Sequence, residues 1–499
     1  MTTETEQIGL EHGSHQLSQS AAALAREKSR KGNIELAMYL TLALLAGYLF
    51  FDRAFAWLHV PGTPLFIGEI VMVVVLSLTF LSHHVLRLFQ LSRPMQALGV
   101  FVMWGFILMG IGLPSAQIDA VRDAALFYYA FFAVVAGVIL LARPDLEDRM
   151  INLYTRALAL FFSLGWIRLL FQGGEMEKIE NGFPLMPDSL VPITSHKTGN
   201  IAVQAAMGLI FVGLLVWPRL KTTSQKTWWA LLSLSGLAMF VVAGTQTRGG
   251  MLAGGIAFIF LWAMSKATRR TMISATLITL VLATLAVSFD VKFDLDRREV
   301  SVQQFAGNIF SILTGGEEGN AEEELAQEDP NANTANWRLE LWGDVWGDVV
   351  GFRRGIAGFG FGESLAERYD KADTRLGEEI QLRNPHNSHL SVLARMGVTG
   401  AVLWVILFVV WFRTLSKARR NLQLSEKDQK ARLLLWCQLS VIAILINAFF
   451  DPTLEGPQVG IWLWFIFGMG SAIAFEGHRE RWRRTMERAK ARKQLVSGT

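Results

Sequence analysis

The sequence is dominated by apolar segments of about 20 residues, the length that an α-helix needs to cross the hydrocarbon core of a bilayer. Only 18% of the 499 residues are charged, whereas about 25% are charged in a typical soluble domain. We therefore predict an all-α integral membrane protein with about 12 transmembrane helices. The predicted helices occupy residues 34–52, 64–83, 95–113, 123–142, 151–171, 198–217, 227–245, 249–265, 271–289, 397–413, 432–450 and 459–476.

Basic residues gather in every second loop between these segments. Because cytoplasmic loops carry an excess of Lys and Arg, we predict that both termini face the cytoplasm. Residues 1–33 are polar, lack the apolar core of a signal peptide and are predicted to form a mobile cytoplasmic tail. Residues 477–499 are predicted to form a basic cytoplasmic tail. The basic residues of the alternate loops include Arg87, Arg93, Arg143, Arg149, Arg219, Lys221, Lys226, Lys266, Arg269, Arg270, Lys417, Arg419 and Arg420.

This topology divides the chain into two groups of helices around one long loop. Residues 34–289 hold nine predicted transmembrane helices, and residues 397–476 hold three more. Residues 290–396 form one extracytoplasmic loop that is far longer than an ordinary connection, and loops of this length are usually functional or disordered. The stretch 315–333 is acidic and poor in apolar residues, which predicts a mobile segment.

The second half of this loop has the composition of ordered structure. Residues 336–355 carry tryptophan and valine at helical spacing, so we expect a helix on or near the membrane surface. The sequence 358-GFGFG-362 follows, and no strand–helix unit surrounds it, so we interpret it as a tight turn rather than a dinucleotide site.

The distribution of charge separates an enzyme from a transporter. Transporters typically carry charges in the middle of their spans and are built from repeated halves. Here Glu35, Glu69 and Arg156 lie near the ends of predicted spans, and the sequence has no convincing internal repeat. We therefore favour an enzyme that works at one membrane surface. A lipid or polysaccharide transporter and a non-catalytic scaffold remain as alternatives.

Two residues stand out on the predicted extracytoplasmic face. The sequence 384-NPHNSHLSVLARMGVTG-400 places His386 at the mouth of a transmembrane helix. Arg248 lies in a short outward turn, where a charge is costly unless it faces water or a partner. Histidine is the side chain best suited to act as a general base near neutral pH, and arginine binds phosphate in a bidentate manner.

We predict no metal site. The single cysteine, Cys437, excludes an intramolecular disulfide and a cysteine-based metal site. Asp294 and Asp296 form a DLD motif, but Arg297 and Arg298 follow at once and favour local ion pairing.

The spacing of several blocks resembles that of the O-antigen ligase and O-antigen polymerase superfamily. The blocks in the outer loop are Arg338 with Trp342, 358-GFGFG-362, and the pair His386–Asn387 followed by nine residues and 397-GVTG-400. The block 245-TQTRGG-250 matches as well. A looser match is 195-SHKTGN-200, in which Thr198 and Gly199 separate Lys197 from Asn200.

This resemblance implies a C-type glycosyltransferase-like membrane enzyme in the bacterial inner membrane, with its active site facing the periplasm. Such enzymes transfer a glycan from undecaprenyl diphosphate to an acceptor hydroxyl. Ligases use a sugar of lipid A–core, and polymerases use another repeat unit. We favour the ligase type and keep the O-antigen or exopolysaccharide polymerase as the alternative. The resemblance implies no metal and no other cofactor, and we expect no nucleic-acid partner.

The resemblance also implies roles for individual residues. We predict that His386 is the general base and that Arg248 stabilises the diphosphate. Asn387 is expected to orient His386 or to bind sugar, and His389 is either a partner of His386 or an ordinary interfacial residue. The residues that we expect to bind the substrate are Arg122, Lys197, Arg338, Asn387, His389 and Arg395.

Overall fold

The computed structural model of the chain describes residues 3–80, 82, 84–166, 169, 184–187, 191–266, 268–270, 273, 293–295, 298–300, 330–351, 354–369 and 384–497. Within these residues the fold is helical apart from a short antiparallel hairpin. The helices are α1 (Thr3–Ala56), α2 (Ile67–Phe80), α3 (His84–Leu91), α4 (Arg93–Ala116), α5 (Ile118–Asp123), α6 (Ala125–Tyr128), α7 (Phe131–Ala142), α8 (Leu146–Leu164), α11 (Thr198–Phe211), α12 (Thr223–Gln246), α13 (Arg248–Met264), α17 (Pro330–Val350), α18 (Leu365–Arg368), α19 (Ser388–Gln423), α20 (Asp428–Asn447) and α21 (Pro457–Ser497), and the strands are β1 (Phe293–Leu295) and β2 (Arg298–Val300).

The helices support a multi-pass membrane protein. Seven described helices are long and apolar enough to cross a membrane, and the number rises to nine if the bent pairs α2–α3 and α5–α7 each form one span. The predicted number of about 12 is therefore not reached within the described residues. Helix α8 covers residues 151–164 of the predicted span 151–171, but four charged residues lower its hydropathy; they are Glu147, Asp148, Arg149 and Arg156.

Two further predicted spans are absent from the candidate membrane helices for other reasons. Helix α13 covers the prediction 249–265 apart from its last residue, but its 17 residues are at the lower limit of the roughly 17–25 that a span takes. The prediction 271–289 lies almost entirely outside the described residues.

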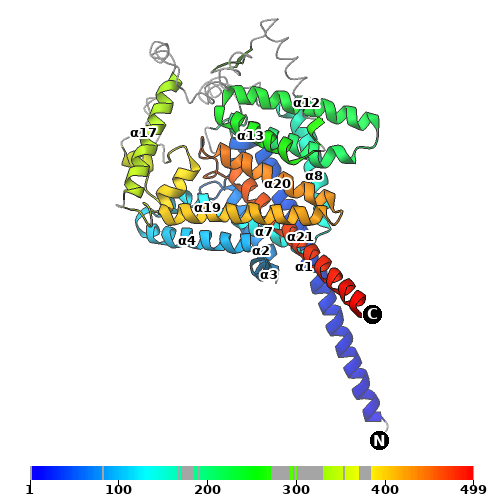
Figure 1. Cartoon of the computed structure of the whole chain (residues 1–499). Coiled ribbons are helices and arrows are strands. Elements are labelled where there is room, and N and C mark those ends of the chain that lie inside the picture. Colours follow the sequence, from blue (N-terminus) through cyan, green and yellow to red (C-terminus); the bar gives the residue numbers. More distant parts are fainter. Residues whose placement is uncertain are drawn as a thin grey trace.

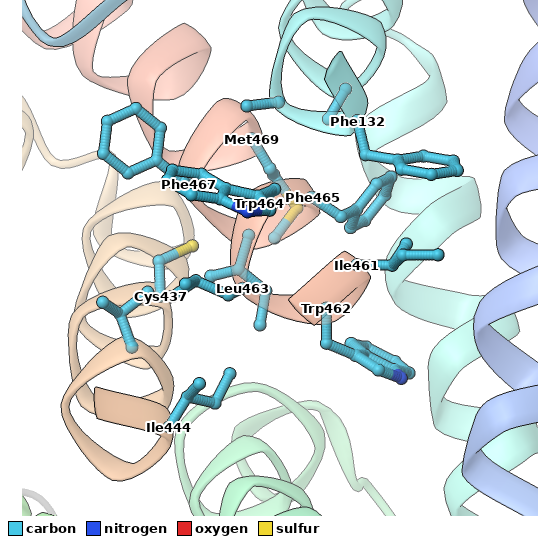
Figure 2. Close-up of a cluster of buried hydrophobic side chains, with 14 of the residues drawn as sticks. Phe132, Cys437, Ile444, Ile461, Trp462, Leu463, Trp464, Phe465, Phe467 and Met469 are labelled. Atoms are coloured by element: carbon cyan, nitrogen blue, oxygen red, sulfur yellow. The ribbon is translucent and has the colours of Figure 1, made fainter. Parts of the chain in front are cut away.

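The centre of the helix body is built around α21. Figure 2 shows Trp464, Phe467 and Phe465 of this helix between α20 and α7, which contribute Cys437 and Phe132. All five side chains are buried. Because α21 packs on both sides, its membrane-spanning part is apolar around most of its circumference, as expected of a helix in the middle of a bundle.

The two ends of the helix body differ. The N-terminal half of α1 and the C-terminal end of α21 project together from one end, and α17 lies at the opposite end (Figure 1). Residues 3–33, predicted as a polar tail, form the first part of α1. The tail predicted at 477–499 is likewise a continuation of α21, as far as residue 497.

Helix α17 confirms the helix expected in residues 336–355. Its buried residues Leu341, Val345 and Val349 are spaced by four, so they form one stripe, and they pack against Leu390 and Leu393 of α19. This apolar stripe is therefore covered by protein, and α17 is fixed beside the start of α19.

A break in α19 receives the glycine-rich turn 358-GFGFG-362. Gly397 has φ 67°, a left-handed conformation that interrupts the helix. The carbonyl of Ala394 instead accepts the N–H of Phe359 at 2.7 Å, and the carbonyl of Arg395 accepts that of Gly360 at 3.2 Å. The N–H of Val398 donates to a carbonyl of the same loop at 2.8 Å. The prediction that 358-GFGFG-362 is a tight turn is confirmed.

Candidate active site

The start of α19 holds the His386–Asn387 pair in a defined geometry. The side chain of Asn387 accepts the N–H groups of His389 and Leu390 at 3.0 and 3.1 Å and so caps the helix. Asn387 is buried, and its oxygen is occupied by this cap. Only its amide N–H₂ group is left for the sugar or for His386.

His386 precedes the cap in a strained conformation. Its φ is 52°, in the left-handed region, and its N–H donates to the side-chain oxygen of Asn384 at 3.3 Å. The indole N–H of Trp342 in α17 donates to the carbonyl of Pro385 at 2.7 Å. Non-glycine residues adopt this region at an energetic cost, and such strain concentrates at functional sites. The imidazole is half-buried.

The start of α19 is hydrogen-bonded to the loop between α20 and α21, residues 448–456. The N–H of Ser388 donates to the carbonyl of Ala448 at 2.8 Å. The hydroxyl of Ser388 bonds the carbonyl of Asp451 at 3.4 Å and accepts the N–H of Leu454 at 3.2 Å. The residues that follow His386 are thus tied to the 448–456 loop.

Two predicted cationic residues reach the same loop from distant parts of the chain. Lys197 forms an ion pair with Asp451 at 2.9 Å. Arg338 of α17 donates to the carbonyl of Phe450 at 3.5 Å. The loop therefore brings Lys197 and Arg338 to the neighbourhood of His386.

Arg248 lies at the first position of α13, beside this loop. The following residue, Gly249, packs so closely on Phe450 that an added Cβ would stand 2.6 Å from the Phe450 Cβ. Thr247 caps α13 by accepting the N–H of Gly250 at 3.1 Å. The Arg248 side chain is exposed and has no hydrogen bond or ion pair with any residue that the structure describes.

The block 195-SHKTGN-200 packs against the block that contains Arg248. A Cβ on Gly250 would stand 3.1 Å from the Cα of Gly199, so the two helix starts are in contact. Asp52, at a break in α1, accepts the N–H of Lys197 at 2.6 Å and the amide of Asn200 at 2.9 Å. The three sequence blocks at 195–200, 245–250 and 386–400 thus meet at one place.

Residues 234–405 match the sequence profile of the O-antigen ligase family. The chain therefore carries an O-antigen ligase family domain. This family comprises membrane enzymes of the O-antigen ligase and polymerase type. No curated protein matches the chain.

The O-antigen ligase family domain contains Arg248, Arg338 and His386, whereas Lys197 and Asp451 lie outside it. The site is therefore completed by helices on both sides of the domain.

His389 has a structural role in this domain. The indole N–H of Trp404 donates to Nδ1 of His389 at 3.0 Å, and Nε2 lies 2.8 Å from the carbonyl of Leu445. Because an indole N–H can only donate, Nδ1 accepts and Nε2 carries the proton that it donates to Leu445. Both nitrogens are therefore occupied by partners within the protein, and the substrate contact predicted for His389 stays a prediction.

Arg395 also has its partners within the protein. Its side chain is 1% exposed and pairs with Asp123 at 2.8 Å. It also donates to the carbonyl of Glu363 at 3.2 Å, and Asp123 accepts the N–H of Gly362 at 2.9 Å. Arg395 therefore helps to fix the glycine-rich turn, and its predicted contact with the substrate stays a prediction. A buried charge needs such a partner, which explains this arrangement.

Within the described residues, no hydrogen bond or ion pair joins Arg122 to the 448–456 loop. It is exposed and its nearest carboxylate is Asp119, at 3.6 Å on the same short helix. The sequence places Arg122 at the start of a predicted span, but it does not indicate which residue pairs with Arg122.

Sequence reasoning missed two acidic residues of the 448–456 loop, Asp451 and Glu455. The hydroxyl of Ser391 donates to Glu455. Burial raises the pKa of the Glu455 carboxyl to about 7, although Arg395 and the Ser391 hydroxyl lower it. The available signal was the sequence 450-FDPTLEGP-457, in which two acids lie between two apolar helices.

No group of three His, Cys, Asp or Glu side chains suited to a metal ion occurs among the residues described. Asp294 of the DLD motif lies in β1, opposite Glu299 of β2. Asp296 and Arg297 are outside the described residues, so the ion pairing predicted there stays a prediction.

Proposed function

We propose that this protein transfers a glycan from undecaprenyl diphosphate to an acceptor hydroxyl, in the manner of an O-antigen ligase. The observation that carries the proposal is the convergence of Lys197, Arg338 and the Arg248 turn on the 448–456 loop, to which the residues beside His386 are also tied. We call Lys197, Arg338 and Arg248 the cation cluster. Three cations near one histidine suit a reaction with a diphosphate leaving group.

In the proposed mechanism the acceptor oxygen attacks the anomeric carbon of the donor in one displacement. His386 takes the proton of the acceptor hydroxyl as the new C–O bond forms. The bond between the anomeric carbon and the phosphate oxygen breaks, and undecaprenyl diphosphate leaves with its electron pair. Arg248, Lys197 and Arg338 stabilise the charge that develops on the diphosphate, so the scheme needs no metal ion. A single displacement inverts the anomeric configuration.

The proposal places this reaction on the periplasmic face of the bacterial inner membrane. The alternation of basic loops supports cytoplasmic termini. The positions of α17 and of the two termini at opposite ends of the helix body support the same orientation (Figure 1). Helix α17 holds Arg338, so the cation cluster belongs to the end away from the termini.

The alternative within the same family is an O-antigen or exopolysaccharide polymerase. Both reactions use the same donor and the same cations, and they differ in the acceptor glycan. Complementation of a strain that lacks this protein separates them. Wild type, His386→Ala and Arg248→Ala are expressed at equal levels, and the lipopolysaccharide and free polysaccharide fractions are compared.

We expect both variants to lose glycan attachment to lipid A–core. Arg87→Ala, at an exposed arginine of α3 on the predicted cytoplasmic side, is the matched control. Loss of chain elongation instead of attachment would favour the polymerase, and full activity in both variants would contradict the proposed site.

A further inference from the structure

A groove outside the cation cluster lies between α4 and the glycine-rich turn. Its volume is about 380 Å³, within the range of small-molecule binding sites. One wall is the C-terminal end of α4, and the other is the turn that follows Arg354. The residues that line the groove include Leu108, Ile111, Ser115, Arg354, Phe359 and Glu363.

The groove is a preformed site because its turn is held from two sides. The turn is bonded to the break in α19 through Phe359 and Gly360, and to Asp123 through Gly362. On the α4 side, a Cβ on Gly112 would stand 2.4 Å from the carbonyl oxygen of Phe361. A wall fixed in this way loses little conformational freedom when a ligand binds.

The lining combines groups of opposite polarity. Arg354 and Glu363 are both exposed on it, and Ser115 contributes a hydroxyl, while Ile111 and Phe359 contribute apolar surface. The Arg354 side chain has no hydrogen bond or ion pair with any described residue. The Glu363 carboxylate is paired with Arg368 at 2.5 Å. A lining that carries both signs of charge does not favour a simple anion, and the polar groups disfavour an acyl chain. A sugar has hydroxyls that donate and accept and C–H faces that pack on apolar side chains.

The groove and the cation cluster lie on different sides of α19. In Figure 1, α4 lies on one side of α19, and α20 and α13 lie on the other. Along α19, Arg395 follows His386 by nine residues, or roughly 13 Å at 1.5 Å per residue. In a direct displacement, the acceptor approaches the anomeric carbon from the side opposite to the leaving diphosphate. Because the proposed mechanism assigns the diphosphate of the donor to the cations, the groove on the other side of α19 is left for the second substrate, the acceptor.

We propose that the groove between α4 and residues 354–363 binds the glycan of the acceptor, a few sugars away from the hydroxyl that reacts. The inference rests on the proposed glycan transfer and adds the place of the acceptor to it. The groove fixes where the acceptor chain lies, while the cation cluster fixes the donor.

The test uses the purified full-length protein in detergent, with an undecaprenyl-diphosphate-linked repeat unit as donor. Deacylated core oligosaccharide and a lipid-free repeat-unit oligosaccharide serve in turn as acceptors. Ser115→Trp fills the groove, and Ile107→Trp places the same ring on an exposed position of α4 outside it. Arg354→Ala is a second variant, and it changes the groove without inserting a large ring.

We expect Ser115→Trp to raise KM for the acceptor about tenfold, with KM for the donor unchanged, because only acceptor binding is lost. Ile107→Trp should retain the wild-type values, and Arg354→Ala should raise the acceptor KM in the same direction. An unchanged acceptor KM in both groove variants would overturn the proposal, and so would a raised donor KM alone. A wild-type protein that transfers no glycan would instead refute the proposed function, which separates the two failures.

Discussion

Lys197 and Asp451 are 254 positions apart and form an ion pair at 2.9 Å. The pair joins the start of α11 to the 448–456 loop, whose backbone also receives Arg338 and Ser388. This loop, rather than any of the three sequence blocks, holds the proposed active site together.

Asp451→Asn is expected to lower kcat/KM about tenfold, which corresponds to about 1.4 kcal/mol of transition-state stabilisation. Without the carboxylate, the ammonium of Lys197 is no longer fixed near the proposed diphosphate position. Transfer rates of purified variants check this. Lys197→Met should show a loss at least as large, and the double variant should be no worse than Lys197→Met alone. Additive losses would show that the two residues act independently.

His389→Ala is expected to destabilise the protein by about 2–3 kcal/mol and to change kcat/KM of the folded protein little. The variant leaves the Trp404 N–H and the Leu445 carbonyl without their partner, which is the costly case for a buried hydrogen bond. Thermal unfolding in detergent measures the first effect and glycan transfer the second. A normal unfolding temperature with lost transfer would mean that His389 contacts substrate after all.

Gly397→Ala is expected to destabilise the docked loop by about 1–3 kcal/mol, the cost of a non-glycine residue in a strained left-handed conformation. A Cβ there would also stand 2.2 Å from the carbonyl oxygen of Ile356. Gly255→Ala in α13 is the matched control, because a Cβ at that helical position meets no atom within 4 Å. Limited proteolysis of the 354–369 segment reports the loss of docking. Equal resistance in both variants would contradict the role of the break in α19.

Glu455 is expected to make stability fall as the pH rises. Its pKa is raised from 4.5 to about 7 in the folded protein, so the folded state binds the proton more tightly than the unfolded state. The carboxyl is protonated in both states below pH 4.5 and ionised in both above pH 7, so its contribution changes only between these values.

The unfolding temperature of the wild type should therefore fall more steeply across this window than that of Glu455→Gln. Glu363→Gln serves as the control for the loss of an exposed carboxylate. Identical slopes in wild type and Glu455→Gln would refute the assignment.

The membrane class and the position of most helices follow from the apolar segments alone, because a span needs a long run of apolar residues. The number of spans does not follow. Helix α8 is amphipathic and charged near its start, and α13 is short, so both form helices without meeting the length and hydropathy of a span. A helix that packs on protein does not need to be apolar on every face.

The site was predictable only in part. The spacing of His386 to the Gly397 break, and the isolated charge of Arg248, pointed to the residues that the 448–456 loop gathers. The roles of His389 and Arg395 did not follow, because their partners Trp404, Leu445 and Asp123 are set by packing and not by neighbouring sequence. Asp451 was missed for the same reason.

The most direct test of the proposed catalytic role is the single-turnover rate of glycan transfer by purified His386→Ala. The rate should fall by about 10²–10⁴-fold, the usual contribution of a general base. The unfolding temperature and the KM for the lipid-linked donor should stay at their wild-type values. A wild-type rate in the folded variant would contradict the account, because the loop that gathers the cations would then surround a histidine that takes no part in the reaction.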